Sequence, residues 1–290
     1  MTKNISKVCI LLASFNGERY IKQQLISILN QKKIKLDIFI SDDASTDSTV
    51  NIINSFIKKY SNISLLPFRN SSFRSPGANF YYLLTSQDFS KYDYIALSDQ
   101  DDIWPEHKLS RAVSLLRNSQ YDGYSSDFLI FNDDTHLTKY FKKSNQQTAF
   151  DFIFETPGPG CSFVLNQKLA ISLQVFLKNN NVDSFKYHDW LIYAFARSNN
   201  FCWYIDKSPN LFYRQHNHNF MGSNTSFYGF LKRLMDVFSG RWTKDIRYIN
   251  HMFGEKRSLW FYLIFFYKTR RSTSHKFLML FFLFYMALQK

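Results

Sequence analysis

Short apolar or β-prone runs alternate with amphipathic stretches along the first half of the chain. Such runs, bounded by polar residues, are typical of strands buried in a parallel sheet. We expect strands over residues 8–13, 38–40, 63–66 and 92–98. Between the runs, apolar residues recur three and four positions apart, which predicts helices with one buried face. These helices are expected over residues 18–30, 50–57, 77–87 and 105–116, the last with Pro105 in its first turn.

This alternation predicts an α/β domain with a mostly parallel sheet and flanking helices. A further strand is expected over 163–165, and the polar stretch 132–147 is expected to be a loop. In parallel sheets, ligands bind beyond the carboxyl ends of the strands. Three polar clusters fall at that edge, namely Ser14–Gly17, Asp42–Ser45 and Asp99–Asp102. Their convergence is stronger evidence for a binding site than any one cluster.

Composition narrows the class of protein. The hydrophobic fraction of 45% supports a sizeable core and excludes disorder as the general state. The three cysteines, Cys9, Cys161 and Cys202, are odd in number and widely spaced, which predicts a reducing compartment. Residues 1–7 lack the apolar core of a secretory signal, so we expect no export.

The charge of the chain is concentrated near its C-terminus. The formal net charge is +13, and residues 230–290 hold twelve Lys and Arg against three Asp and Glu. The aromatic runs 259–267 and 277–286 are shorter than the roughly 20 residues of a spanning helix. Apolar runs flanked by cations predict interfacial helices on an anionic membrane surface. The alternative is a C-terminal helical subdomain that packs on the main core.

The densest group of carboxylates follows the strand at 92–98. Asp99, Asp101 and Asp102 lie within four residues, and oxygen ligands of this kind suit Mg²⁺ and Mn²⁺. Mutually repelling carboxylates also need a compensating cation. We expect Asp101 to be the direct metal ligand and Asp99 to face the ribose or diphosphate of a nucleotide. The alternative is a solvated turn with a capping aspartate.

A second acidic pair, Asp42 and Asp43, ends another strand. A carboxylate there can accept hydrogen bonds from a base imide or a sugar hydroxyl, or it can cap the helix that follows.

Further along, Asp189 lies at the expected start of a helix, between His188 and Trp190. It is either a buried general base with a tuned pKa or a capping carboxylate.

Two late polar residues are weaker candidates. Arg214 could bind phosphate, and the imidazole of His216 could complete the coordination of a metal. Either residue taken alone is more often a surface side chain.

Gly160 allows a ligand to approach the backbone, and Cys161 is expected to pack or to line a pocket, not to act as a nucleophile.

Five motifs in order carry a resemblance to a known family. They are Ala13–Gly17, Ser41–Asp47, Leu97–Trp104, Gly160–Ser162 and His188–Trp190. Together they resemble the family-two inverting glycosyltransferases with the GT-A fold. The similarity is closest to the bacterial rhamnosyltransferase-like branch, which builds O-antigen, capsule and cell-wall polysaccharide. It covers roughly residues 6–222, which implies a catalytic domain over 1–222 and a helical, basic and aromatic membrane-associating region over 223–290.

The resemblance implies a role for each matching residue. The nucleotide-sugar would be bound by Ser14, Asn16, Asp42, Asp43, Asp99 and Arg214. Asp101, in the Asp-x-Asp motif with Asp99, would hold Mn²⁺ or Mg²⁺ together with His216. Asp189 matches the catalytic base, and the acceptor and sugar pocket would comprise Gly160, Cys161, His188 and Trp190. Asn217 departs from the family pattern, in which Gly often follows the histidine.

The expected activity is transfer of a sugar from dTDP-rhamnose or a UDP-hexose to a hydroxyl of a lipid-linked glycan, with inversion. The expected location is cytoplasmic, peripheral on the inner face of the cell membrane. A metal-dependent nucleotidyltransferase acting on a sugar phosphate is the alternative, because it also places carboxylates and a metal at strand ends. Nucleic acid is not an expected partner, since acidic clusters at the ligand edge would repel a phosphate backbone. A non-catalytic sugar-binding module would need neither the metal carboxylates nor Asp189.

Overall fold

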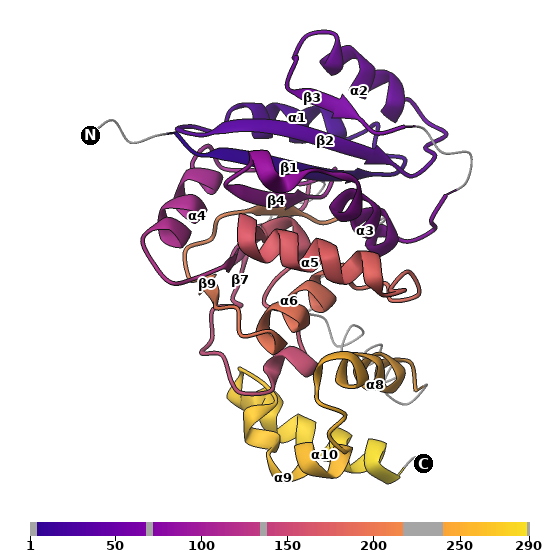
Figure 1. The fold of residues 1–290 in the computed structure, drawn as a ribbon, viewed down its shortest axis with the longest axis vertical. Coiled ribbons are helices and arrows are strands. Elements are labelled where there is room, and N and C mark those ends of the chain that lie inside the picture. The colour runs from indigo at the N-terminus through magenta and orange to yellow at the C-terminus, as the bar shows by residue number, and fades with distance from the viewer. Residues whose placement is uncertain (1–4, 68–71, 134–137, 217–239, 289–290) are drawn as a thin grey trace.

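The computed structural model describes residues 5–67, 72–133, 138–216 and 240–288 (Figure 1). Its larger sheet has seven strands in the order β3-β2-β1-β4-β8-β5-β9, and a smaller sheet has the order β10-β6-β7. The strands of the larger sheet are β1 (Lys7–Ser14), β2 (Lys35–Asp42), β3 (Ile63–Leu65), β4 (Tyr94–Ser98), β5 (Gly123–Ser126), β8 (Val164–Asn166) and β9 (Trp203–Asp206). The smaller sheet comprises β6 (Phe128–Phe131), β7 (Thr138–Phe141) and β10 (Phe212–Arg214).

The larger sheet is parallel except at β8, which runs antiparallel to both β4 and β5. The prediction of an α/β fold with a mostly parallel sheet is therefore confirmed. β1 is buried on both faces, because its alternate residues point to opposite sides of the sheet. Cys9 and Leu11 join one hydrophobic cluster, whereas Val8, Ile10 and Leu12 join the other.

Helices cover both faces of this sheet. One face packs on α1 (Ile21–Leu29), α2 (Thr49–Ile57) and α4 (Lys108–Arg117). The other face packs on α3 (Pro76–Ser86), α5 (Gln167–Asn179) and α6 (His188–Ser198). Short 3₁₀ turns lie at η1 (Phe89–Lys91), η2 (Asp151–Ile153), η3 (Gly160–Ser162) and η4 (Phe266–Lys268).

Two local expectations were wrong. The helix expected from Pro105 begins at Lys108, because the carbonyl of Pro105 closes a turn by accepting from the Lys108 N–H at 2.9 Å. The stretch 132–147, expected to be a loop, contains strand β7. That strand pairs antiparallel with β6 and lies at the edge of the smaller sheet, with mostly exposed side chains. Its polar sequence reflects the exposed edge and carries no alternating apolar signal.

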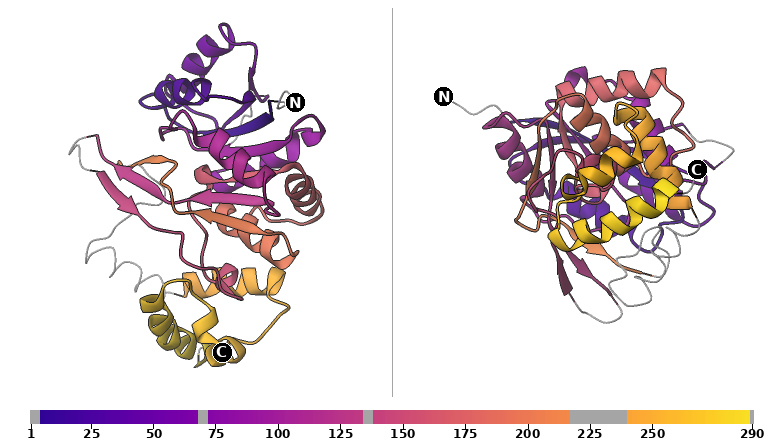
Figure 2. Two further views of the ribbon diagram at one scale, coloured as in Figure 1. Left: turned by 90° about the vertical axis from the view of Figure 1, so that its left-hand side faces the viewer. Right: turned by 90° about the horizontal axis from the view of Figure 1, so that it is seen from below.

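The C-terminal helices are α8 (Arg241–Phe253), α9 (Leu259–Ile264) and α10 (Thr273–Leu288). They lie at the end of the molecule opposite α2 and β3, and the view from below shows them spread across that end (Figures 1 and 2). Their buried side chains belong to the same hydrophobic cluster as α3, α5 and α6. Among the described residues, no helix is both long and apolar enough to cross a membrane. The expected boundary between 222 and 223 falls outside the described residues.

Candidate functional site

The carboxyl ends of β1, β2 and β4 meet at one edge of the sheet, as the sequence predicted. Ser14 lies opposite Asp42 in the parallel register, and the Ser14 hydroxyl donates a hydrogen bond of 2.8 Å to the Asp42 carboxylate. The other two bonds to that carboxylate come from the backbone N–H and hydroxyl of Ser45, at 2.8 and 2.6 Å. Asp42 is 7% exposed. Its visible role is to hold the turn after β2, in which Ala44 has a positive φ of 63°.

Asn16 and Asp43 shape the same corner. The side-chain oxygen of Asn16 accepts from the Thr46 N–H at 2.9 Å, so it ties the loop after β1 to the loop after β2. Asp43 accepts from the Ser72 hydroxyl at 2.8 Å and from the Phe73 N–H at 2.6 Å. These bonds bring the segment before α3 against the ends of β1 and β2. The structure therefore gathers the expected nucleoside residues into one corner.

The acidic loop after β4 is fixed by a residue that sequence reasoning missed. The Gln100 side-chain amide accepts from the Phe15 N–H at 2.9 Å and donates to the Phe15 carbonyl at 2.8 Å. A Cβ on Gly17 would lie 2.1 Å from the Gln100 side-chain oxygen, so Gly17 leaves room for this amide. The available signal was an uncharged hydrogen-bonding side chain inserted between two aspartates.

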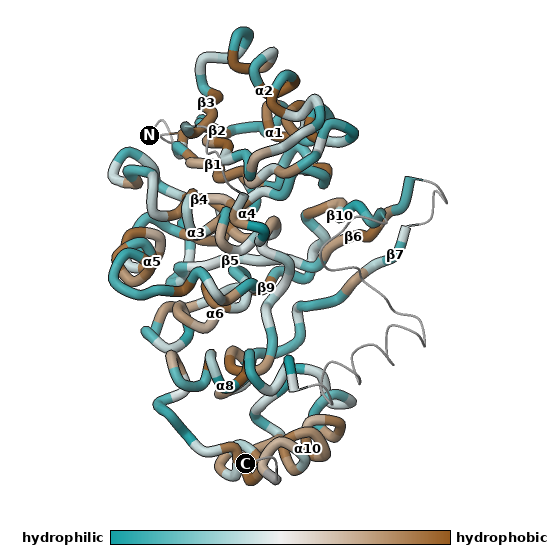
Figure 3. Tube along the Cα trace, turned by 90° about the vertical axis from the view of Figure 1, so that its right-hand side faces the viewer, coloured by the Kyte–Doolittle hydropathy of each residue, from teal (hydrophilic) through white to brown (hydrophobic). Residues whose placement is uncertain are grey.

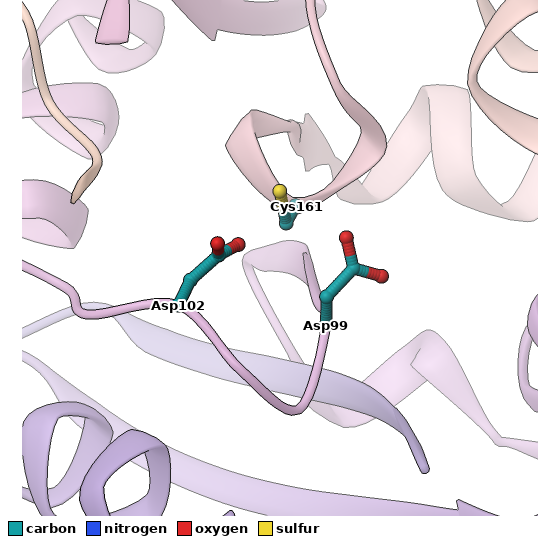
Figure 4. Close-up of side chains that lie close together, drawn as sticks. All are labelled: Asp99, Asp102 and Cys161. Atoms are coloured by element: carbon teal, nitrogen blue, oxygen red, sulfur yellow. The ribbon is translucent and has the colours of Figure 1, made fainter. Parts of the chain in front are cut away.

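The three aspartates of this loop separate into two groups. Asp99 and Asp102 rise from two ends of the loop toward the segment that carries Cys161 (Figure 4). One ligand atom from each of these three residues lies within 4.8 Å of the others. Asp101 instead pairs with His216, whose Nε2 lies 2.9 Å from Oδ2 of the aspartate. The structure thus brings together the two residues expected to hold the metal.

The pKa values of the group formed by Asp99, Asp102 and Cys161 make it a weaker candidate for a metal site than Asp101 with His216. Burial, followed by the charge of Asp101, raises the pKa of Asp99 to about 7 and that of Asp102 well above its usual range. Burial and both neighbouring aspartates raise the pKa of the Cys161 thiol, so the thiol stays protonated and hydrogen-bonds Asp102. A protonated, buried thiol is a poor metal ligand, because the thiolate is the binding form.

The Asp101 and His216 pair fits a divalent cation better. Their side chains are 14% and 13% exposed, so an ion can reach them. A carboxylate oxygen with an imidazole nitrogen suits Mn²⁺, and carboxylates with added phosphate oxygens suit Mg²⁺. An ion here would also offset the repulsion among Asp99, Asp101 and Asp102. The donor set of this structure therefore accommodates the expected cofactor.

The described contacts of Arg214 tie its side chain and backbone to the acidic loop. Its backbone N–H donates to Asp102 at 3.2 Å, and its Nε donates to the Asp101 carbonyl at 2.8 Å. Its guanidinium also donates to Gln23 and Asp133, and the rings of Tyr20 and Phe131 lie on its faces. The side chain is 3% exposed. Arg214 therefore anchors the acidic loop from β10. Tyr20, which contacts Arg214, also stacks on the His216 ring, with the ring centroids 4.8 Å apart.

The residues expected to line the acceptor and sugar pocket meet at the first turn of α6. His188 stacks on Phe80 at 4.0 Å, and a Cβ on Gly160 would lie 2.1 Å from the His188 Nε2. Burial lowers the pKa of His188 to about 3, so the ring stays neutral. The indole of Trp190 donates to the Phe152 carbonyl at 2.9 Å and is 7% exposed, so it packs beneath the pocket.

Asp189 follows His188 and is partly exposed. Its carboxylate accepts from the Trp190 N–H at 2.8 Å within the first turn of α6, whose N-cap residue is Tyr187. Burial raises the pKa of Asp189, while that bond, the charge of Lys143 and a hydrogen bond from Thr156 lower it. The charge of Asp189 also raises the pKa of Asp99, which places the two carboxylates in one electrostatic environment. Asp189 is thus a first-turn carboxylate, which suits the helix dipole, and it is not the capping residue of α6.

Comparisons with known proteins agree with this geometry. The model of glycosyl transferase family 2 matches residues 9–177. The chain is 41% identical over 238 residues to the dTDP-rhamnosyl transferase RfbG of Shigella flexneri, covering 81% of this chain and 82% of that protein. It is 24% identical over 165 residues to the Escherichia coli protein WfgD, a UDP-Glc:α-D-GlcNAc-diphosphoundecaprenol β-1,3-glucosyltransferase, covering 57% of this chain and 62% of that one.

Among solved structures, residues 1–349 of Staphylococcus aureus TarS superpose with a TM-score of 0.59 at 15% identity. That match covers 98% of this chain and 72% of the solved TarS segment, and it supports the fold alone. The family match and the identity to RfbG decide between the two expected enzyme classes, in favour of sugar transfer over nucleotidyl transfer. The chain belongs to glycosyltransferase family 2.

Proposed function

We propose that this enzyme transfers L-rhamnose, with inversion, from dTDP-L-rhamnose to a hydroxyl of a lipid-linked glycan during synthesis of a bacterial surface polysaccharide. The observation that carries the proposal is the placement of an acidic cation site and a partly buried aspartate at one sheet edge, in a chain 41% identical to a dTDP-rhamnosyl transferase. WfgD, which uses UDP-glucose by name, makes a UDP-hexose the second candidate donor.

The reaction follows from the two halves of the site. Asp189 accepts the proton of the acceptor hydroxyl, and the freed oxygen attacks the anomeric carbon as the bond to the diphosphate breaks. General base catalysis of this kind contributes typically ~10²–10⁴-fold to the rate. A divalent cation bound by Asp101 and His216 would supply charge stabilisation for the departing diphosphate. Asp99 would face the donor between these two halves, as its electrostatic link to Asp189 suggests.

The remaining residues would shape the pockets. Ser14, Asn16, Asp42 and Asp43 would form the nucleoside corner, in which Asp42 acts through the turn that it holds. Gly160, Cys161, His188 and Trp190 would form the sugar and acceptor wall. Arg214 would position Asp101 and Asp102 beside the bound nucleotide-sugar.

A donor panel tests the proposal. Purified protein with Mn²⁺ is incubated with dTDP-L-rhamnose or with UDP-hexoses, and its melting temperature is measured. A ligand that binds the native state raises apparent stability, so we expect the largest rise with dTDP-L-rhamnose. Transfer is then followed by release of dTDP with a GlcNAc-diphosphoundecaprenol acceptor, and the anomeric configuration of the product is read by NMR. A rise with a UDP-hexose and none with dTDP-L-rhamnose would refute the donor assignment.

We also propose that residues 1–222 carry the catalytic machinery and that 223–290 carry a surface for the anionic inner face of the cell membrane. On α10, Met279, Leu283 and Met286 pack inward. The outward face of α9, η4 and α10 carries large apolar side chains that are 47–70% exposed, namely Trp260, Ile264, Tyr267, Phe277, Phe281 and Phe284. Figure 3 shows α10 as a largely hydrophobic segment at the end of the molecule.

The charge around this aromatic face suits an anionic bilayer. Residues 240–288 contain nine Lys and Arg against two Asp and Glu. Helices of this kind lie in the interface plane and combine apolar burial with attraction to anionic lipids. A lipid-linked acceptor would then reach the site from the same surface.

Vesicle co-sedimentation tests this location. We expect binding to vesicles containing phosphatidylglycerol, and loss of binding when Phe281 and Phe284 are both replaced by Ser. The matched control is Val175→Ser, since Val175 is 54% exposed on α5. Equal sedimentation of all three proteins would refute the assigned face.

A further inference from the structure

The acceptor side of the site is held by an arginine from the C-terminal region. Arg271 lies just before α10, outside the part of the chain matched by the family model, and its side chain is 2% exposed. Its guanidinium donates to the Asp151 carboxylate at 3.1 Å and to the Thr156 carbonyl at 2.6 Å. Its backbone N–H donates to Glu155 at 2.7 Å. Arg271 therefore contacts both ends of the segment from Asp151 to Thr156.

Asp151 connects this arginine to the helix that carries Asp189. Its side chain is fully buried and also pairs with Arg197 at 2.9 Å, and it accepts from the Tyr193 hydroxyl at 2.8 Å. Arg197 and Tyr193 both lie on α6, whose first turn holds Asp189. One buried carboxylate thus joins the C-terminal region to α6.

Thr156 provides the second connection. Its hydroxyl donates to the Gly158 carbonyl at 2.8 Å, and it also lies close enough to Asp189 to lower the pKa of that carboxyl. Because Arg271 holds the Thr156 carbonyl, it fixes a residue whose hydroxyl influences Asp189. From Thr156 the chain continues to Gly160, which lies against His188.

We infer that Arg271 is a positioning residue for sugar transfer. It sets the orientation of Asp189 by two routes, one through Thr156 and one through Asp151, which binds the helix α6 that carries Asp189. This inference rests on the proposed role of Asp189 as the base. It makes the C-terminal region a part of the acceptor wall, in addition to any contact with a membrane. A misplacement of about 1 Å in a reacting group can reduce the rate roughly 100-fold.

The titratable and polar groups near Asp189 are Asp99, Lys143, the Tyr81 hydroxyl from α3 and the Thr156 hydroxyl. Asp99 lies beyond the end of β4, Lys143 follows β7, and the Thr156 hydroxyl comes from the segment after η2. The Thr156 hydrogen bond and the Lys143 charge both favour the ionised carboxylate. Loss of the Thr156 bond should therefore raise the pKa of Asp189 and move the acidic limb of the kcat profile to higher pH.

The test compares Arg271→Met and Thr156→Val with wild type. We expect roughly 10- to 100-fold lower kcat, an acidic limb displaced to higher pH, and unchanged calorimetric affinity for the nucleotide-sugar. Thr156→Ser keeps the hydroxyl and should recover both kcat and the pH profile. Arg257→Met is the matched arginine control, because Arg257 pairs with the exposed Glu255.

The outcomes separate this inference from the proposed function. If Arg271→Met fails to fold, the comparison of Thr156→Val with Thr156→Ser still decides. Wild-type kcat and pH profile in Thr156→Val, or equal losses in Thr156→Val and Thr156→Ser, would overturn the positioning role. If Asp189→Asn is inactive in those same experiments, the proposed base stands and this inference alone fails. Near-normal transfer by Asp189→Asn would instead remove the base on which the inference rests.

Discussion

Substitution of Gly160 by Ala tests how closely the acceptor pocket is packed. The added Cβ would lie 2.1 Å from Nε2 of His188, 2.9 Å from Cδ2 and 3.1 Å from Cε1. The imidazole has little room to retreat, because it stacks on the buried ring of Phe80 at 4.0 Å. The Nε2 atom has no hydrogen-bond partner among the described residues, so the contact with Phe80, and not a hydrogen bond, restrains the ring. The ring, and with it the first turn of α6, must therefore shift.

The size of the effect follows from these distances. An unstrained contact needs about 3.5 Å between heavy atoms, so the shortfall is roughly 1.4 Å. Overpacking of a buried site costs typically 1–3 kcal/mol. For a chain of this size that cost lowers the melting temperature by roughly 2–6 °C. Because Asp189 follows His188 in the same turn, a shift of about 1 Å should also reduce kcat roughly 100-fold.

The assay measures kcat, calorimetric donor affinity and melting temperature for Gly160→Ala. The control is Gly158→Ala in the same segment, where the nearest atom to a new Cβ is the Ser162 hydroxyl at 3.0 Å, which can rotate. A double variant with His188→Ala should abolish the additional cost of Gly160→Ala, since the ring is removed. An unchanged melting temperature and kcat in Gly160→Ala would refute the close packing of this wall.

Three further predictions concern the charged groups. Asp101→Ala should remove the Mn²⁺-dependent part of nucleotide-sugar binding, and equal calorimetric affinities with and without Mn²⁺ in wild type and variant would contradict a metal site there. Asp189→Asn should keep donor binding and lose ~10²–10⁴-fold in transfer. Burial raises the pKa of Asp189, and the base must be ionised to accept a proton. Wild-type activity should therefore rise with pH through a midpoint above the usual aspartate pKa of about 3.9. A midpoint at or below that value would contradict the assignment of Asp189 as the base. Asp151→Asn removes the carboxylate that pairs with Arg197 and leaves Arg271 with Glu155 as its remaining acidic partner, so the free energy of unfolding should fall by about 3 kcal/mol, as measured by denaturant titration.

Local sequence patterns predicted most of the catalytic half of the fold. The alternation of apolar runs and amphipathic stretches located β1, β2, β3 and β4 and the helices between them, with ends displaced by a few residues. The start of α6 at His188 was also expected. Strand β7 was missed because an exposed edge strand has no buried face to produce an alternating pattern.

The position of a residue at the sheet edge was easier to predict than its contacts. Asp99, Asp101 and Asp102 were expected at the strand end because their position follows from the preceding apolar run. Their partners could not be predicted in the same way. Asp101 meets His216, whereas Asp102 lies beside the Cys161 thiol and accepts from the Arg214 backbone.

The sequence by itself determined the order of strands and helices, the sheet edge at which the polar clusters meet, and the family resemblance. These depend on periodicities of two and 3.6 residues and on short motifs, which are local. The tertiary structure decided which charge each buried carboxylate faces. Arg214 lies 113 residues from Asp101, and Arg271 lies 120 residues from Asp151. Contacts at such separations are selected by the packing of the whole core and by the cost of leaving a buried charge unpaired, and neither leaves a local pattern in the chain.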